Sequence, residues 1–468
     1  MNVSKLLKTA MCRQYFLLLA LLFILSQQQA FADGSAPTTS ELETKINQLQ
    51  QEIDVLKAKE SQQQTSNIYS QNKNTKQGKR YKRHLTNMAQ IQNYLLSDLS
   101  PKTIPLGMLP SSQLALGMLK QRNHYPDRAL VVGGVLESDM QAWSGSKVVY
   151  EDPDTNKTAY YQSGRGIYLT QASLFAAANL GHYVTTEVNL LGDQNNAPII
   201  NEAVALFGNL QESPFYAMVG KSAFPFGTFA GGGVWTPSLG QMLFSPYYVT
   251  NLELGYSHYG VNSTLTAFQT DDQSSNFAYA IFYKKATKNY NYGVNVGYLY
   301  NVNGSGNTTF DAITNPSIGN KTRIGALDAE YALGYKAVSL SMGVAEATDK
   351  STLTNNGYAG AWYAQLALSP TLWGRETDFS LAYNGAYNSN NLPVILSGSA
   401  VNEYTTTPEL NANNAVELSG TGANKLVIGS IQRPFFTTDV LLGLEYAYMH
   451  FYNHGHTNTY TLDLSVYF

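Results

Sequence analysis

The chain ends with the stretch Tyr460-Thr461-Leu462-Asp463-Leu464-Ser465-Val466-Tyr467-Phe468, and this stretch decides the fold class. Every second residue from Tyr460 to Phe468 is aromatic or aliphatic, and three of the four residues between them are polar. Successive side chains of a β-strand point to opposite sides. The alternation therefore predicts a strand with one apolar face and one polar face.

The same period of two recurs from residue 129 onward in segments of about ten residues. Between Tyr290 and Tyr298, for example, tyrosine and valine alternate with asparagine and glycine. The pattern predicts an all-β fold, a transmembrane antiparallel β-barrel of about 16 strands over residues 129–468. The expected strands are 129–143, 166–178, 181–191, 199–209, 214–225, 248–258, 261–270, 276–285, 290–300, 323–334, 336–346, 358–368, 376–387, 425–432, 437–451 and 457–468.

The connections between these strands alternate between long and short. The long connections follow odd-numbered strands and include 144–165, 226–247, 301–322 and 388–424. The connections that follow even-numbered strands are brief. Bacterial outer-membrane barrels show this alternation, with short turns in the periplasm and long loops outside. A final Phe after an alternating strand also resembles the C-terminal signal for the barrel assembly machinery. We therefore expect the outer membrane and its lipid to surround the barrel.

Residues 1–32 are predicted to be a secretory signal peptide. Basic residues precede an apolar core over 15–25, and Ala30-Phe31-Ala32 offers a small-residue cleavage site. The core is shorter than the roughly 20 residues that a transmembrane helix needs. Cys12 is the single cysteine of the chain, so the mature protein is expected to have no thiol chemistry.

Two further segments precede the predicted barrel. Residues 33–60 are predicted to be a coiled-coil segment that holds the protein in a homo-oligomer, and a helix packed on the barrel is the alternative. The prediction rests on apolar residues spaced alternately four and three apart. Residues 61–128 are predicted to be a polar and basic linker in the periplasm, and a periplasmic helix or a plug are the alternatives for its second half. The apolar residues of the predicted coiled coil in 33–60 are Leu42, Ile46, Leu49, Ile53 and Leu56.

Composition and motifs argue against an enzyme. Charged residues make up 13% of the chain, and there are 33 Tyr and 38 Gly; a soluble enzyme carries about 25% charged residues. No Gly-rich phosphate loop, paired cysteines or His-Glu-x-x-His motif is present. We expect no catalytic residues, no cofactor and no nucleic-acid partner. His450, His454 and His456 are weak metal-ligand candidates, because Asn453-His454-Gly455-His456 also suits an ordinary turn.

Acidic residues dominate the predicted barrel, which has 14 Lys and Arg against 25 Asp and Glu. Carboxylates that line a water-filled tube favour cations and repel anions. The alternative is that such groups simply solvate a polar wall. The strand pattern points six candidate lumen-lining carboxylates inward: Glu187, Glu253, Asp328, Glu330, Glu445 and Asp463.

Two connections are candidates for recognition. Residues 226–247 combine three consecutive glycines with apolar residues, and we expect them to fold back and constrict the pore, with a contact between subunits as the alternative. Residues 388–424 are long and rich in Asn, Thr and Ser, which suits a lid or a recognition surface. The aromatic candidates in the constriction are Phe226, Phe229, Trp235 and Phe244.

Four short elements carry a family resemblance: Phe207-Gly208-Asn209-Leu210, Ser213-Pro214-Phe215-Tyr216, Val219-Gly220-Lys221 and Pro225-Phe226-Gly227-Thr228-Phe229. Together with the signal peptide, coiled coil, linker and barrel in that order, they resemble the LbtU-type siderophore porins. The resemblance implies uptake of a ferric siderophore through the outer membrane without covalent chemistry. The Gly-Lys…Pro-Phe-Gly element is also similar to other porins with N-terminal coiled coils.

Two alternatives to a siderophore channel stay open at this point. One is a general or substrate-specific porin for small cationic or neutral solutes. The other is a surface adhesin, for which loops 301–322 and 388–424 would form the binding surface.

Overall fold

A computed structural model describes residues 114–122, 127–152, 157–194, 196–269, 275–287, 289–314, 323–396, 404–405, 409–410, 416–417, 420–437 and 439–468. The chain divides into Met1–Lys82 and Arg83–Phe468, and every described residue belongs to the second unit. The predicted signal peptide and coiled coil, and residues 61–113 of the predicted linker, lie outside the described residues.

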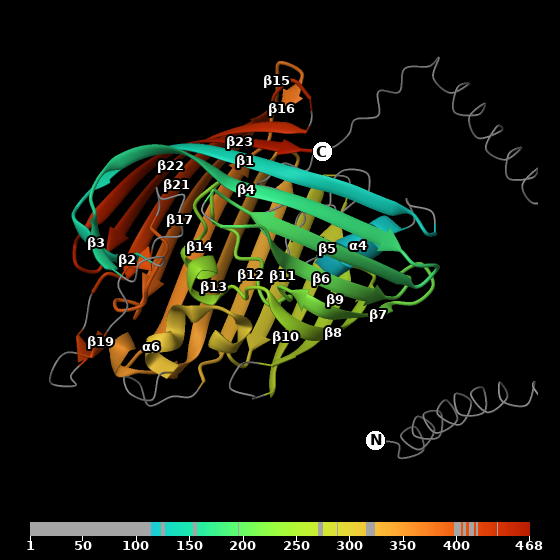
Figure 1. Ribbon diagram of the computed structural model, residues 1–468, viewed down its shortest axis with the longest axis horizontal. Coiled ribbons are helices and arrows are strands. Elements are labelled where there is room, and N and C mark those ends of the chain that lie inside the picture. Colours follow the sequence, from blue (N-terminus) through green and yellow to red (C-terminus); the bar gives the residue numbers. More distant parts are fainter. Residues whose placement is uncertain are drawn as a thin grey trace, which may run out of the picture. The chain divides into compact units, whose positions relative to one another are not determined.

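Sixteen strands form one closed antiparallel barrel (Figure 1). The predicted strand number and the closed antiparallel all-β barrel are thus confirmed, and each expected strand overlaps an observed one. The strands are β1 Leu130–Gly145, β4 Gly164–Asn179, β5 Val184–Gly192, β6 Ile199–Phe207, β7 Phe215–Ser222, β8 Val249–His258, β9 Val261–Gln269, β10 Ser275–Ala286, β11 Tyr290–Leu299, β12 Ala326–Tyr335, β13 Val338–Lys350, β14 Tyr358–Leu368, β17 Asp378–Tyr387, β21 Ala423–Pro434, β22 Val440–Phe451 and β23 His456–Tyr467.

Side chains alternate between the two faces of the wall, as the period of two predicts. In β12 buried and exposed residues alternate along the whole strand. The exposed residues form an apolar outer face that includes Val296, Leu327, Leu444 and Tyr460. The inward positions between them carry Asn, Thr, Asp and Glu as well as Ala and Gly. The alternation in the sequence therefore places apolar residues on the outer face of the wall and largely polar residues on its inner face.

The terminal stretch 460–468 closes the barrel. β23 pairs with β1 from Gly145↔Thr457 to Val135↔Tyr467, and with β22 on its other edge. Phe468 extends this pairing, because its N–H donates to Gly134 O at 3.1 Å and its O accepts from Gly134 N–H at 2.8 Å. The first and last strands thus leave no free edge.

The connections distinguish the two ends of the barrel. One end, here the short-turn end, carries 180–183, 208–214, 259–260, 287–289, 336–337, 369–377 and 435–439. The other, the long-loop end, carries connections such as 146–163, 300–325 and 388–422. The predicted alternation holds for most connections, but 193–198 and 452–455 at the long-loop end are shorter than 208–214 and 369–377 at the short-turn end. Connection 369–377 is longer than a tight turn because it folds into a hairpin of β15 Thr371–Leu372 and β16 Arg375–Glu376.

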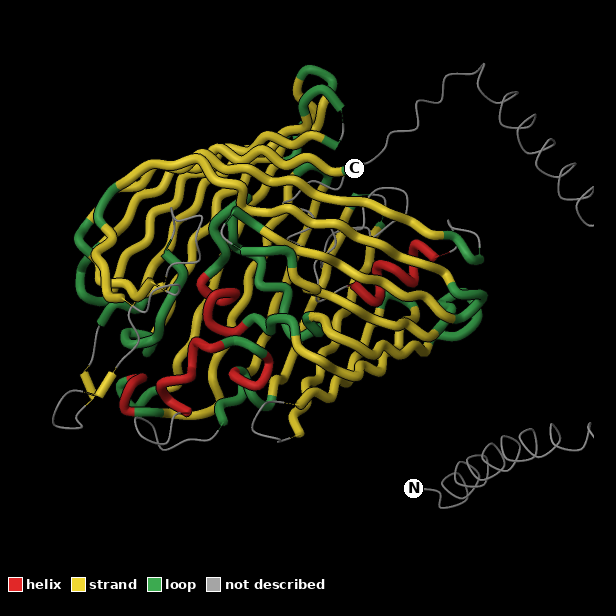
Figure 2. Tube along the Cα trace, in the orientation of Figure 1, coloured by secondary structure: helices red, strands yellow, loops and turns green. Residues whose placement is uncertain are grey.

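Short elements decorate the connections (Figure 2). β2 Val148–Asp152 and β3 Lys157–Tyr161 form a hairpin that β18 Tyr404–Thr405 joins, and β19 Glu409–Leu410 pairs with β20 Val416–Glu417. None of the described helices is long and apolar enough to cross a membrane. The helices are α4 Leu114–Gln121, α5 Leu239–Phe244, α6 Asp311–Thr314 and the 3-10 turns η5 Asn303–Ser305, η6 Thr308–Phe310 and η7 Thr352–Thr354.

Candidate functional site

The connection between β7 and β8, residues 223–248, is the lumen loop. It does not extend away from the barrel. Instead it contacts inward-facing residues of β11, β12, β14, β17 and β22, strands far from β7 and β8 along the wall. The loop therefore crosses the interior, as the prediction of a fold-back segment at 226–247 expected.

Glu330 on β12 holds the first part of the lumen loop. Its carboxylate accepts the main-chain N–H of Thr228 at 2.6 Å and that of Phe229 at 2.7 Å. It also accepts the Thr228 hydroxyl at 2.6 Å and the Tyr363 hydroxyl at 3.0 Å. Hydrogen bonds to an ionised acceptor are about twice as strong as neutral ones. This carboxylate is therefore a fixed anchor for the loop.

Glu445 on β22 holds the middle of the loop in the same way. Its Oε2 accepts from Trp235 N–H at 2.8 Å and its Oε1 from Thr236 N–H at 3.0 Å. Gly233 makes this approach possible, because a Cβ at that position would lie 2.0 Å from Glu445 Oε2. Two wall carboxylates on different strands thus satisfy main-chain donors that would otherwise be buried without a partner.

Wall amides complete the anchoring. Gln365 on β14 accepts from Gly231 N–H at 3.3 Å and donates to Gly232 O at 3.0 Å. Asn384 on β17 donates to Gly231 O at 2.9 Å, and Asn295 on β11 donates to Phe226 O at 3.2 Å. Because an amide can both donate and accept, these residues pair with both kinds of main-chain group.

The aromatic residues predicted for recognition have two different positions. Phe226, Phe229 and Phe244 are at most 5% exposed and pack in one apolar cluster with Phe224, Leu239 and other residues. Their rings stabilise the loop against the wall and are not available to a solute, which corrects the expected role of these three. Trp235 is half-buried and is the one of the four candidates with exposed surface. A contact between Trp235 and a solute stays a prediction.

All six predicted carboxylates are buried on inward positions, with exposed fractions between 1% and 5%. Glu330 and Glu445 hold the loop, and Asp328 accepts from Asn295. Glu253 accepts the Tyr216 hydroxyl at 3.0 Å. Both carboxylate oxygens of Glu187 are buried without a hydrogen-bond partner. The six residues therefore divide into loop anchors and wall carboxylates, and Asp463 lies where β23 meets β1.

Basic residues do not balance these acids in the described part of the chain. An ion pair joins His182 to Glu212 at the short-turn end, away from these carboxylates. Arg122 is the one Lys or Arg among the buried side chains of the described residues, and it hydrogen-bonds the main-chain oxygens of Gly181 and Gly208. When these carboxyls are ionised, a wall without a buried basic partner gives its interior a negative potential.

Helix α4 lies within the short-turn end. Leu114, Leu116, Met118 and Leu119 are at most 4% exposed and pack against inward-facing residues of many strands, such as Phe175. Figure 1 places α4 and α6 at opposite ends of the barrel. The last part of the segment before β1 therefore fills interior space at the end opposite the long loops.

Two of the three histidines of the last hairpin lie near polar side chains, and a metal site there stays a prediction. His450 Nδ1 lies 2.7 Å from Asn424 Oδ1, and His456 Nδ1 lies 3.4 Å from Ser146 Oγ. Among the described residues, the cluster of His, Cys, Asp or Glu ligand atoms close enough for a metal ion is instead Glu137, Asp139 and Asp463. The turn interpretation of 453–456 agrees with His454, whose φ is 64°.

Sequence reasoning missed the polar face of β1. Glu137, Asp139 and Gln141 occupy alternate inward positions, next to the exposed Leu136 and Met140. The signal was present as Leu-Glu-Ser-Asp-Met-Gln at 136–141, in which every second residue is acidic or amide. The outward Ser138 hid the alternation, and a β-bulge toward β4 lies at this point.

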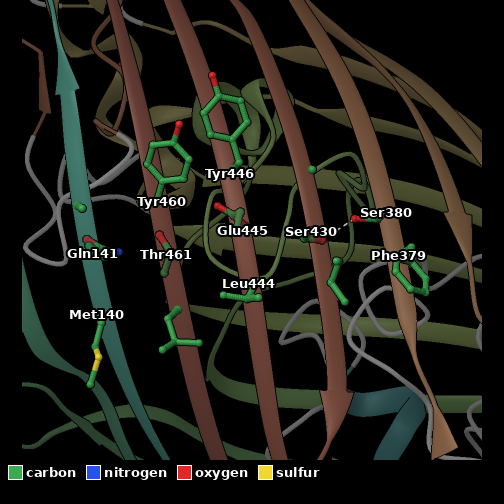
Figure 3. A pocket seen from close by; sticks show the side chains of 14 residues that line it. Met140, Gln141, Phe379, Ser380, Ser430, Leu444, Glu445, Tyr446, Tyr460 and Thr461 are labelled. Carbon is green, nitrogen blue, oxygen red and sulfur yellow. Dashed lines mark hydrogen bonds between the residues drawn. The ribbon is translucent and has the colours of Figure 1, made fainter. Parts of the chain in front are cut away.

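A pocket of about 730 Å³ lies along β1, β23, β22, β21 and β17 (Figure 3). Most of its lining is apolar and belongs to the exposed outer face, for example Met140, Leu444 and Tyr460. Gly429 leaves space there, because a Cβ at this position would meet no heavy atom within 4 Å. This pocket is a groove on the outside of the wall and is not the path of a solute.

Comparisons with known proteins give one family and several barrels. The family described as "Protein of unknown function (DUF3573)" matches residues 84–327. No curated protein matches the chain. Solved structures that are similar include the outer membrane channel DcaP of Acinetobacter baumannii, at 10% identity and a TM-score of 0.46, over 73% of this chain and 98% of that one. OmpF of Salmonella typhi in complex with daunomycin gives 10% identity and 0.45, also over 73% and 98%. A loop deletion mutant of OmpT of Vibrio cholerae gives 8% and 0.45, over 73% and 100%.

Proposed function

The chain belongs to the DUF3573 family, whose members are described as proteins of unknown function, and we propose that it is an outer-membrane channel for small cationic or neutral solutes. One observation carries the proposal: a loop crosses the interior of a sixteen-stranded barrel and is held by carboxylates of the wall. Porin barrels of about this strand number leave an aqueous channel.

The outer face supports a position in a membrane. Large apolar residues are exposed on successive strands around the wall, such as Val296 at 53%, Leu327 at 52% and Leu444 at 55%. Water-soluble proteins rarely expose apolar patches beyond a few hundred Å². Lipid chains match such a surface, and a closed barrel leaves no unpaired main-chain groups at its edges.

The lumen loop supports selection by size. Its main chain is fixed at Glu330 and Glu445 and its Phe side chains are packed, so it narrows the interior without depending on a moving part. A rigid constriction gives a reproducible exclusion limit, since the residues that line it cannot withdraw. The half-buried Trp235 is the aromatic residue that we expect a passing solute to meet.

The charge of the wall supports a preference for cations. Glu187 and Glu253 are inward-facing and have no basic partner among the described residues. When ionised, carboxylates of the wall raise the concentration of cations in a confined space beside them and lower that of anions. Neutral solutes pass according to their size.

A ferric siderophore is the second candidate solute. Of the four elements that resemble LbtU-type siderophore porins, 225–229 lies at the start of the lumen loop, where Thr228 and Phe229 donate to Glu330. The other three lie at the end of β6, in turn 208–214 and on β7. We propose this cargo on the resemblance and on the place of 225–229 in the loop that crosses the interior.

Liposome swelling with amino acids of similar size and different charge tests the channel proposal. We expect a cationic and a neutral amino acid to enter faster than an anionic one. The double change Glu187→Gln and Glu253→Gln should reduce the difference, whereas Glu212→Gln, at an exposed position of the short-turn end, should leave it unchanged. An absence of swelling with every solute would contradict the proposal.

Uptake of iron-55 siderophore by a strain lacking this protein tests the second candidate. Reduced uptake that returns on complementation supports the siderophore cargo. Normal uptake excludes it and leaves the channel proposal standing on the swelling assay.

A further inference from the structure

The barrel closes at a seam that is polar on its inner face. Across β1 and β23 three inward pairs follow one another: Glu137↔Ser465, Asp139↔Asp463 and Gln141↔Thr461. Glu137, Asp139, Gln141, Thr461 and Asp463 are called the seam cluster below. None of the carboxylates at the seam belongs to the anchoring of the lumen loop.

The three carboxylates of the seam cluster are very close together. One oxygen from each of Glu137, Asp139 and Asp463 lies within 4.8 Å of the others. No Lys or Arg of the described residues forms an ion pair with them. Like charges at this spacing repel strongly in a buried setting, so the arrangement needs a compensating positive charge or bound protons.

Neutral donors satisfy only part of the cluster. Thr170 on β4 donates its hydroxyl to Asp139 Oδ2 at 2.7 Å, and Ser465 donates to both oxygens of Asp463 at 3.2 Å. Asp139 Oδ1 is buried and has no hydrogen-bond partner. A buried carboxylate oxygen without a donor is costly unless another positive group faces it.

Gln141 gives a second and independent indication. Its side chain is 3% exposed, and neither its amide oxygen nor its amide nitrogen has a hydrogen-bond partner. It is inward-facing, two residues beyond Asp139 on the same strand, and Figure 3 shows it next to Thr461. The hydroxyl oxygen of Thr461 is also buried without a partner. Gln141 and Thr461 are the next inward pair after Asp139 and Asp463. Their unused oxygens therefore lie on the same face as the carboxylates and can complete a donor set for a cation.

We propose that the seam cluster binds a divalent cation, Ca²⁺ in preference to Mg²⁺. All available donors are oxygens, which both ions prefer. Ca²⁺ takes oxygens at about 2.4 Å, so two ligands on opposite sides of it lie about 4.8 Å apart. The spacing of the three carboxylates fits this limit. Mg²⁺ needs about 2.1 Å and a strict octahedron, whereas the coordination of Ca²⁺ is flexible and tolerates an irregular set of oxygens.

A cation at this place joins the first and last strands of the barrel. Glu137, Asp139 and Gln141 come from β1, while Thr461 and Asp463 come from β23. Binding would add cross-links to the one strand pair whose members are farthest apart in the sequence. It would therefore stabilise the closed barrel and remove part of the negative charge of the interior.

The test uses the full chain in detergent, free of lipopolysaccharide. Thermal unfolding is measured in CaCl₂, MgCl₂ and EDTA, and terbium luminescence reports binding directly. We expect Ca²⁺ to raise the unfolding midpoint, Mg²⁺ to raise it less, and Ca²⁺ to displace Tb³⁺. Gln141→Ala keeps every charge, and we expect it to weaken Ca²⁺ binding at least about tenfold.

The double change Asp139→Asn and Asp463→Asn should abolish the Ca²⁺-dependent shift, whereas Glu187→Gln, which removes a wall carboxylate outside the cluster, should keep it. If the double variant does not fold, Gln141→Ala and the titration of the wild-type chain decide. No Ca²⁺ binding by the wild type would overturn the site and indicate carboxyls that share protons. If Glu187→Gln lost the Ca²⁺-dependent shift to the same extent, this would also overturn the site. It would indicate that Ca²⁺ is attracted diffusely to the charged interior. The readouts do not depend on transport, so the channel proposal can fail separately.

Discussion

At the scale of single residues, Glu330 and Glu445 show how a wall carboxylate can act on the main chain of a loop. Between them they accept four main-chain hydrogen bonds, from Thr228, Phe229, Trp235 and Thr236. Each bond to a charged acceptor contributes about 1.5–3 kcal/mol. The loop is therefore fixed at two points, and a change at either point should release part of it.

Gly233→Ala tests the anchor at Glu445. The new Cβ would lie 2.0 Å from Glu445 Oε2 and 2.7 Å from Ile428 Cγ2, so the carboxylate must leave its amide donors. We expect a loss of about 2–4 kcal/mol in the docking of the loop, and a larger and noisier single-channel conductance. The matched control is Gly240→Ala in α5, where the nearest atom would be 3.4 Å away. Equal conductance in the two variants would contradict the anchor.

The contacts of Glu212 at the short-turn end predict that the stability of turn 208–214 depends on pH. Hydrogen bonds from the Tyr183 hydroxyl and from His182 hold the pKa of this carboxyl below its ordinary value. The stabilisation of turn 208–214 is therefore complete above the ordinary pKa and is lost as the pH falls through the lowered one. Hydrogen exchange of the turn amides should rise in acid more for the wild type than for Glu212→Gln. The same rise in both would contradict the assignment.

At the scale of elements, the sequence predicted that 226–247 folds back but not how it is held. The glycines and aromatic residues marked the segment as unusual for an exposed loop. Its partners Gln365, Asn384 and Glu445 lie more than a hundred residues later, and no local pattern links them to it. For the same reason the burial of Phe226 and Phe244 was not foreseen, because it depends on side chains from other strands.

Helix α4 is the element that we expect to restrict the short-turn end. Its apolar residues pack against inward-facing side chains, and Arg122 bonds the turns at Gly181 and Gly208. Deletion of 114–122 should therefore increase conductance in a planar bilayer. Leu116→Asp with Leu119→Asp should act in the same direction, because it places charges among buried apolar groups. Lys120→Asp, at an exposed position of α4, is the matched control. Unchanged conductance after the deletion would show that α4 does not limit flow.

At the scale of the whole molecule, the strand number and the two faces could be predicted because both follow from local alternation. Each strand carries its own period of two, and sixteen such segments close into the observed barrel. The seam cluster was not predicted, since Asp139 and Asp463 are more than three hundred residues apart and meet only on closure. Glu187 and Glu253 were predicted as inward-facing and are buried there, but a sequence alone does not exclude a basic neighbour.

We have proposed that the interior of this barrel is a channel with a negative wall. Planar-bilayer recording of the full chain in a KCl gradient measures both properties. We predict discrete conductance steps and a reversal potential of the sign given by K⁺ permeating faster than Cl⁻, with the preference decreasing at high salt, where charges are screened. A silent membrane, or a reversal potential of the sign given by Cl⁻, would contradict it.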